Sequence, residues 1–327
     1  MIPFSPSDGR SASPRLLPMP SRLAASFDSA SPRRIDPLAV LGLLSKRDRT
    51  VITLLEEHEV LTTAQLAALC FPRLDTAQRR LLRLTKLKVL DRFRWRLLRG
   101  SESWHYTLGP VGAALAAAAR DVDPPTPATV RKRVLRLSQR PQLDHLIGLN
   151  DWFCRLATEA REIGAGRDAR LAQWWGERHC ADQYGAIVRP DAAATYIEDG
   201  RRVDFFFEYD NGTETIGRVA AKLTRYGELG EAGGPKVPVV IWCDSAVRER
   251  HLSDAIAHER GAGFPSRITV ATGCSEVTAA LGIGLSGIGW WVPGEATRRC
   301  LVDLASPNGD TTLHEGADVV GVSSWEA

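Results

Sequence analysis

Three closely spaced prolines constrain this chain of 327 residues more than any other feature. Pro124, Pro125 and Pro127 lie within nine residues that connect two structured stretches of the sequence. Proline lacks a backbone N–H and clashes with the preceding helical turn, so no continuous helix can cross this segment. A chain of this length commonly forms about two domains of roughly 150 residues each. The predicted segments are a disordered arm (1–36), an N-terminal domain (37–120), a linker (121–130), a second domain (131–294) and a C-terminal extension (295–327).

Composition and charge exclude several classes of protein. The net charge of +3 is too small to imply a nucleic-acid partner by itself, so the distribution of charge has to be considered instead. The six cysteines include no Cys-x-x-Cys pair, which argues against a zinc knuckle and a disulfide framework. No apolar stretch is long enough to span a bilayer, and the first residues lack the apolar core of a signal peptide. We therefore expect a cytoplasmic protein without a membrane partner.

The first 36 residues are rich in Ser, Pro and Arg. Such a segment buries too little apolar surface to offset the entropy lost on ordering, which predicts a disordered arm. The arm is either an inert tail or a mildly basic segment that contacts DNA phosphates.

Three short helices are predicted in the N-terminal domain. Residues 48–59 carry apolar side chains at helical spacing, and Thr62 or Thr63 is a suitable N-cap for a second helix. A third helix begins at Asp75 or Thr76, after the break at Pro72. A tight turn between the second and third helices is the plan of a helix-turn-helix.

A β-hairpin is predicted directly after the third helix. Residues 90–98 alternate arginine with apolar side chains, which is the period of a strand with one buried face and one basic face. A turn over 99–102 leads to a returning strand over 103–108. A helix-turn-helix followed by such a wing predicts a winged helix.

Positive charge is concentrated on the third helix and the hairpin. Residues 73–99 contain ten Lys or Arg against only Asp75 and Asp91. A basic stripe of this kind is typical of a duplex DNA binder, with the third helix at base edges and the hairpin on phosphates or in the minor groove. The alternatives are a solvated basic face and a protein-binding surface. The predicted DNA-binding residues are Gln78, Arg79 and Arg83 at base edges, Lys86 beside them, and Arg92, Arg94 and Arg96 on the hairpin.

Carboxylates cluster around one strand of the second domain. Residues 203–210 have the apolar character of a buried strand, in which Glu208 and Asp210 point to the same face. Asp191 belongs to a preceding strand. Three carboxylates at one sheet edge repel each other unless a cation is present, which predicts a Mg²⁺ site for phosphodiester cleavage. Alternatively, the three carboxylates cap loops or pair with nearby arginine and lysine side chains.

Asp191 after proline, with Glu208 on the next strand, resembles the PD-(D/E)xK nuclease superfamily. The resemblance implies an α/β core, with Asp191 and Glu208 as metal ligands and catalytic residues. This sequence departs from the superfamily pattern at Asp210, where an active nuclease has a lysine. Lys222 on the following helix would then supply the ammonium, and Asp210 would assist. The implied core elements are a helix over 143–163, strands near 171–175, 192–196 and 203–210, a helix over 216–229 and a strand over 237–243.

The whole arrangement is similar to the replication-relaxation family of plasmid-borne and mobile-element proteins. The motifs that carry the resemblance are PDA, FFFEYDNGTET and KLTRY, and the resemblance covers about residues 46–260. It implies a DNA-binding role in plasmid replication or mobilisation, with double-stranded DNA and replication or mobilisation proteins as partners. Two hypotheses stay open: a DNA-binding protein with a non-catalytic nuclease-like domain, and a Mg²⁺-dependent DNA endonuclease of the PD-(D/E)xK type.

Overall fold

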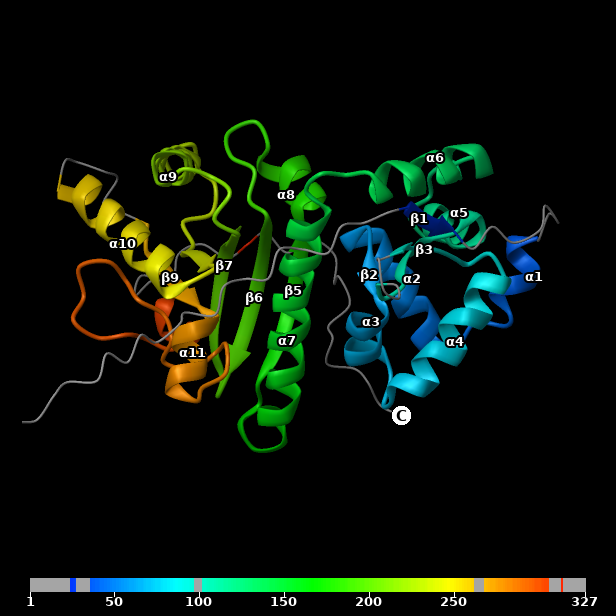
Figure 1. Cartoon of the computed structure of the whole chain (residues 1–327), viewed down its shortest axis with the longest axis horizontal. Helices are drawn as coiled ribbons and strands as arrows, with labels where there is room; N and C mark the ends of the chain where they lie inside the picture. The colour runs from blue at the N-terminus through cyan, green and yellow to red at the C-terminus, as the bar shows by residue number, and fades with distance from the viewer. Residues whose placement is uncertain (1–23, 28–35, 97–101, 262–267, 306–312, 314–327) are drawn as a thin grey trace, which may run out of the picture.

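The computed structural model describes residues 24–27, 36–96, 102–261, 268–305 and 313, which form a mixed α/β fold with two sheets (Figure 1). The predicted α/β class is confirmed. No helix in these ranges is both long and apolar enough to cross a membrane.

The N-terminal part (residues 24–119) combines a small sheet with five helices. Its sheet has the strand order β1-β3-β4-β2, and all pairings are antiparallel. The strands are β1 Ala24–Phe27, β2 Leu61–Thr62, β3 Leu90–Arg96 and β4 His105–Leu108, and the helices are α1 Pro37–Leu41, α2 Lys46–His58, α3 Thr63–Cys70, α4 Leu74–Lys86 and α5 Pro110–Ala119.

Capping boxes fix the starts of α2 and α3. Ser45 accepts a hydrogen bond from the backbone N–H of Asp48, and the Asp48 carboxylate accepts one from the Ser45 N–H. Thr62 and Gln65 make the same reciprocal pair at α3. Each box satisfies two N–H groups that have no partner within the helix. The predicted cap at Thr62 is therefore present.

Strand β1 corrects the prediction of a disordered arm over residues 1–36. Ala24–Phe27 pairs antiparallel with β3, with Ala24 opposite Arg96 and Phe27 opposite Phe93. Composition alone does not reveal this strand, because its stability comes from hydrogen bonds to the free edge of β3. The rest of residues 1–35, residues 97–98 of the predicted strand and residues 99–101 of the predicted turn lie outside the described residues.

The α/β part (residues 127–305) is built on a five-stranded sheet of order β5-β6-β7-β8-β9. Strands β5, β6 and β7 form an antiparallel meander, whereas β8 and β9 continue parallel to β7. The strands are β5 Arg170–Gly176, β6 Ala192–Glu198, β7 Arg201–Asp210, β8 Val239–Cys243 and β9 Val270–Cys274, and the helices are α6 Pro127–Ser138, α7 Leu143–Arg167, α8 Glu177–Tyr184, α9 Ile216–Glu231, α10 Ala246–Gly261, α11 Ser275–Leu281 and the 3₁₀ helix η1 Leu301–Leu304.

Both faces of this sheet are covered, which explains the run of three phenylalanines in β7. Phe205 and Phe207 belong to the apolar cluster that contains the buried side of α7. Phe206 belongs to a second cluster, with α9 and α10. Successive side chains of a strand point to opposite faces, so a strand covered on both sides is apolar throughout. Glu208 and Asp210 share the α9 and α10 face with Phe206.

Helix α6 corrects the predicted linker over 121–130. The helix begins at Pro127, with Thr126 as its N-cap. Proline is well suited to the first helical position, because the N–H that it lacks has no partner there. Pro141 lies in the break between two helices, since α6 ends at Ser138 and α7 begins at Leu143.

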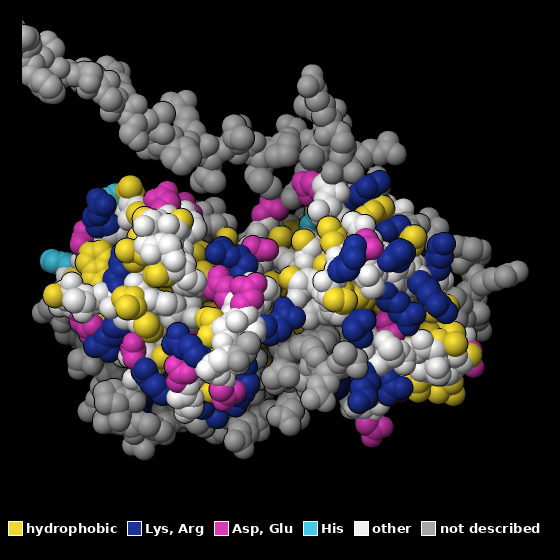
Figure 2. All heavy atoms as spheres, turned by 90° about the horizontal axis from the view of Figure 1, so that it is seen from below, with side chains coloured by type: hydrophobic (Ala, Val, Ile, Leu, Met, Phe, Trp, Pro, Cys, Tyr) yellow, Lys and Arg dark blue, Asp and Glu magenta, His cyan; other side chains and the backbone are white. Residues whose placement is uncertain are grey.

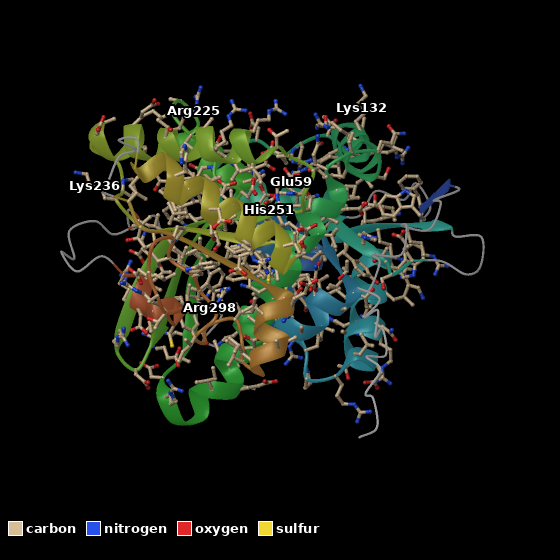
Figure 3. All side chains as sticks on the ribbon, turned by 60° about the vertical axis from the view of Figure 1, so that its left-hand side comes forward. Glu59, Lys132, Arg225, Lys236, His251 and Arg298 are labelled. Atoms are coloured by element: carbon tan, nitrogen blue, oxygen red, sulfur yellow. The ribbon has the colours of Figure 1, made fainter. Side chains whose placement is uncertain are left out.

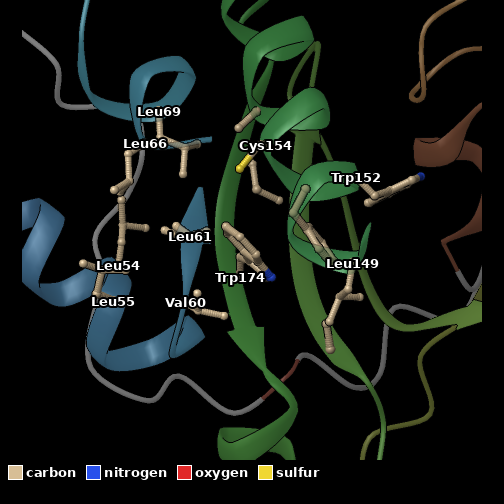
Figure 4. Packing of buried hydrophobic residues seen from close by; sticks show 14 of the residues in the cluster. Leu54, Leu55, Val60, Leu61, Leu66, Leu69, Leu149, Trp152, Cys154 and Trp174 are labelled. Atoms are coloured by element: carbon tan, nitrogen blue, oxygen red, sulfur yellow. The ribbon is translucent and has the colours of Figure 1, made fainter. Parts of the chain in front are cut away.

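The N-terminal part and the α/β part share one apolar core. Leu66 and Leu69 of α3 lie in the same buried cluster as Cys154 of α7 and Trp174 of β5 (Figure 4). Buried polar contacts cross the same boundary: Asn150 Nδ2 donates to the carbonyl of Val60 at 2.9 Å. The two parts are therefore held in a fixed relationship by packing and by hydrogen bonds.

Candidate functional site

Helix α4 has one buried face and one exposed basic face. Ala77, Leu81 and Leu84 are fully buried against α3 and β3, because apolar residues recur at helical spacing along this side. The opposite side is exposed and places four of the predicted residues on one surface. These residues are Gln78, Arg79, Arg83 and Lys86.

One arginine of α4 has a structural role instead. Arg80 donates through Nε to the Asp48 carboxylate at 2.8 Å, and Asp48 is fully buried. Burial alone would raise the pKa of Asp48, but the hydrogen bonds from Arg80 and Ser45 lower it. The Arg80–Asp48 ion pair therefore fixes α4 against the start of α2. Arg79, by contrast, makes an exposed ion pair with Asp75 at 3.0 Å and no other ion pair with the described residues.

The β3–β4 hairpin carries its basic side chains around a tryptophan. Phe93 and Trp95 are buried on one face of β3. On the other face, the guanidinium carbons of Arg92 and Arg94 lie 4.0 and 4.3 Å from the ring centre of Trp104. Cation–π contact with the indole limits the conformations of the two arginines. The arginine alternation predicted the basic face but not the role of Trp104, and Arg96, at the end of β3, has no described side chain.

Figure 2 shows that Lys and Arg side chains gather on the right of the lower surface, the side on which Figure 1 places α4. Fewer acidic side chains are visible there than on the left. The basic surface is therefore a local feature of the N-terminal part, although the net charge of the chain is small.

A second candidate site lies at one edge of the five-stranded sheet. Asp191 directly precedes β6, Glu208 lies on β7, and Lys222 reaches both from α9. The Lys222 ammonium donates a hydrogen bond to Glu208 Oε2, and its Nζ lies 3.7 Å from Asp191 Oδ1. The structure thus brings together three of the four predicted catalytic residues.

The fourth predicted residue, Asp210, is bound elsewhere. Its carboxylate accepts hydrogen bonds from Arg248 Nε at 2.7 Å and Nη2 at 3.1 Å. It also accepts the backbone N–H of Gly212 at 3.0 Å. The prediction that Glu208 and Asp210 share a face is correct, but Asp210 lies two residues further along β7 and pairs with α10. Asp210 therefore forms a bidentate ion pair with Arg248 and does not contact Lys222.

Two residues that were not predicted complete the cluster. His145 Nε2 lies 3.2 Å from Asp191 Oδ2, and the Tyr226 hydroxyl donates to Glu208 Oε1. Tyr226 is four residues after Lys222, so both side chains lie on one face of α9; this spacing is a sequence signal for Tyr226. Helix α7 comes close enough because of Gly148, where a Cβ atom would lie 2.6 Å from the Tyr209 hydroxyl.

The two carboxylates of this cluster differ in their electrostatic environment. Burial opposes ionisation of Asp191, but the hydrogen bond from His145 and the charge of Lys222 lower its pKa to about 2. Burial and then the charge of Asp191 raise the pKa of Glu208 to about 8, although Lys222 and Tyr226 act in the opposite direction. The single Lys222 ammonium thus compensates the buried Glu208 carboxylate and the partly buried Asp191 carboxylate incompletely. Such divergent pKa values are common where acid–base chemistry occurs.

Two carboxylates of this cluster belong to the class of ligand that would hold a magnesium ion. Mg²⁺ is usually held by one or two carboxylates and retains several water molecules. Asp191 and Glu208 would be those ligands, and both of their carboxylates face the Lys222 ammonium. Within the described ranges, no group of three or more His, Cys, Asp or Glu side chains is arranged to hold a metal.

Comparison with known proteins gives one match. The sequence pattern described as replication-relaxation matches residues 52–239, which is more than half of the chain. Neither the curated proteins nor the solved structures give a significant match. The matched segment runs from α2 to the start of β8 and includes both α4 and the Asp191–Glu208–Lys222 cluster. The resemblance to the replication-relaxation family is therefore confirmed, and the chain belongs to that family.

Proposed function

We propose that this protein binds double-stranded DNA through α4 and the β3–β4 hairpin, which together act as a winged helix. Family membership suggests a role in replication or mobilisation. The proposal rests on one observation: α4 buries an apolar stripe and exposes Gln78, Arg79, Arg83 and Lys86 on the opposite side.

The order of elements supports this assignment. Helices α2, α3 and α4 are followed directly by the β3–β4 hairpin, which is the order of a winged helix. In this arrangement the helix before the hairpin enters the major groove, where Gln78 and Arg83 would contact base edges. Arg92 and Arg94, oriented by Trp104, would contact phosphates.

The salt dependence of duplex binding tests this proposal. Arg83→Ala should weaken binding of a labelled duplex, and the slope of log K against log salt should fall, because a cation held in the groove also releases condensed counterions. Arg250→Ala removes an exposed arginine from α10 and serves as the control. An unchanged slope for Arg83→Ala would rule out α4 as the contact surface.

A second candidate function is a Mg²⁺-dependent DNA endonuclease, supported by the position of Lys222. The PD-(D/E)xK hypothesis requires an ammonium beside Asp191 and Glu208, and Lys222 contacts Glu208 directly. When bound, Mg²⁺ would polarise the phosphate and activate water. Lys222 would hold and orient the attacking water, and Tyr226 would orient the Glu208 carboxylate.

A cleavage assay separates the two functions. The labelled duplex is incubated with purified protein, with and without Mg²⁺, beside the Asp191→Ala/Glu208→Ala variant. Mg²⁺-dependent cleavage that the double variant loses would establish the nuclease. Salt-sensitive binding without cleavage is the outcome we expect, and it would make the α/β part a non-catalytic component of a DNA-binding protein.

A further inference from the structure

Helix α6 presents a basic surface that neither candidate site uses. Residues 126–142 contain five Lys or Arg and no Asp or Glu. Arg131, Lys132 and Arg136 are exposed, whereas Val130 and Val134 are buried against the rest of the protein. Figure 3 shows the Lys132 side chain pointing away from the body of the molecule. The helix therefore packs through an apolar face and exposes a positively charged face to solvent.

This basic surface borders a hollow of about 760 Å³. Lys132, Arg133 and Arg136 line the hollow from α6, and Arg140 lines it from the segment before α7. Among the described residues of the lining, Glu59 is the only acidic one, and it pairs with Arg140 at 3.4 Å. Arg140 also pairs with Glu177 at 2.7 Å. The carboxylates of Glu59, directly after α2, and of Glu177, in α8, thus compensate the charge of Arg140.

The other three cations of the hollow have no such compensation. In the described part of the chain, no carboxylate lies within ion-pair distance of Lys132, Arg133 or Arg136. Cations that are not paired within the protein keep their full attraction for an anionic ligand. The hollow is therefore a local excess of positive charge in a recess open to solvent.

The hollow lies between the hairpin and the carboxylate cluster. Helix α6 packs against β3 and α5. On its other side, Arg140 pairs with Glu177, the first residue of α8, and α8 packs against β5 and β6, the strand that Asp191 directly precedes. In Figure 1, α6, α8 and α9 lie along the same upper edge. A ligand in the hollow would thus lie on the path between the hairpin and the cluster.

We propose that this hollow binds the sugar–phosphate backbone of a nucleic acid, as a second and sequence-independent contact. The inference rests on the proposed DNA-binding function and adds a surface to it. Residues 132 and 136 are one helical turn apart, so their charges form a row that suits the regular phosphates of a strand. An acidic protein partner fits less well, because protein interfaces have an apolar centre. Among the described residues of the lining, only Leu135 is a large apolar residue that is exposed.

The double variant Lys132→Ala/Arg136→Ala tests the inference by salt-dependent duplex binding. Both residues are exposed, so the fold should be retained, and circular dichroism checks this. Without these two cations, two fewer phosphates are neutralised, and the slope of log K against log salt should fall by about 1.8. The ratio of affinities for a preferred and a random duplex should not change, because phosphate contacts carry no sequence information.

The matched control is Arg155→Ala/Arg250→Ala, which removes the same net charge from exposed positions on α7 and α10. This control should leave the slope unchanged. If the Lys132/Arg136 variant keeps the wild-type slope while Arg83→Ala lowers it, the α4 proposal stands and the hollow is overturned, which leaves an acidic protein as its partner. If only the Lys132/Arg136 variant lowers the slope, the hollow is supported and the α4 proposal fails. Absence of duplex binding by the wild-type protein would overturn both.

Discussion

The imidazole of His58 stacks on the indole of Trp174, with ring centroids 3.5 Å apart. His58 ends α2 and Trp174 lies on β5, so this contact joins the N-terminal part to the α/β part. His58 is buried, with 3% of its surface exposed. The contact therefore places a titratable group in the apolar boundary between the two parts.

Burial lowers the pKa of His58 to about 4, so stability should fall in mild acid. Below the ordinary histidine pKa of about 6.5, the unfolded chain binds a proton that the folded protein excludes. This stability contribution is complete above pH 6.5 and is lost as pH falls toward 4. We expect a loss on the order of 2–3 kcal/mol in the free energy of unfolding between pH 7 and about pH 4.5. Urea unfolding at a series of pH values measures it, and His58→Phe should remove most of the slope in this window.

Asn150→Ala should destabilise the protein by about 1–3 kcal/mol, because it leaves the buried carbonyl of Val60 without its hydrogen bond. The neighbouring residue Asp151 is exposed, so Asp151→Ala should change stability by less than about 0.5 kcal/mol. Chemical unfolding of both variants makes the comparison. Equal effects would show that the Asn150–Val60 bond does not hold the two parts together.

Two adjacent arginines of α4 should separate stability from DNA binding. Arg80→Ala leaves Asp48 as an uncompensated buried carboxylate and should cost about 3 kcal/mol in the free energy of unfolding. Arg79→Ala breaks only an exposed pair and should cost less than about 1 kcal/mol. It should instead weaken duplex binding. Thermal unfolding measures the stability of the two variants, and titration with duplex DNA measures their affinity. The prediction is wrong if both variants lose stability and affinity to the same extent.

Asp191→Asn should lower the pKa of Glu208 from about 8 toward its ordinary range, because the charge of Asp191 is, after burial, the second cause of the raised value. The carboxyl carbon of Glu208 can be titrated by NMR in both proteins. Asp210→Asn is the matched control, since the Asp210 carboxylate pairs with Arg248 and not with Lys222. An unchanged Glu208 midpoint in Asp191→Asn would mean that the two carboxylates do not interact.

Much of the fold was predictable because it depends on local periodicity. The arginine alternation of 90–98 indicated strand β3, and the apolar spacing near Leu81 and Leu84 indicated α4. Thr62 was recognised as a cap because its interaction with Gln65 spans only three residues. Patterns of this kind are contained within one element, so a single sequence reveals them.

The features that were missed depend on contacts between distant residues. Asp210 meets Arg248 across 38 positions, and His145 meets Asp191 across 46. No sequence pattern indicates that residues at such separations are in contact. Strand β1 was missed for the same reason, since its partner β3 lies far along the chain. Lys222 was anticipated only because the superfamily resemblance implied a lysine near Glu208.

The shared core has a geometric consequence for any DNA that the protein binds. Because Asn150 and His58 fasten the α/β part directly to α2 and the residues after it, the distance from α4 to the Lys222 cluster is set by the fold and not by a tether. A DNA duplex that contacts α4 and also reaches Glu208 must therefore make the two contacts a fixed number of base pairs apart. The rigid fold would thus fix the distance along the DNA between the two contacts.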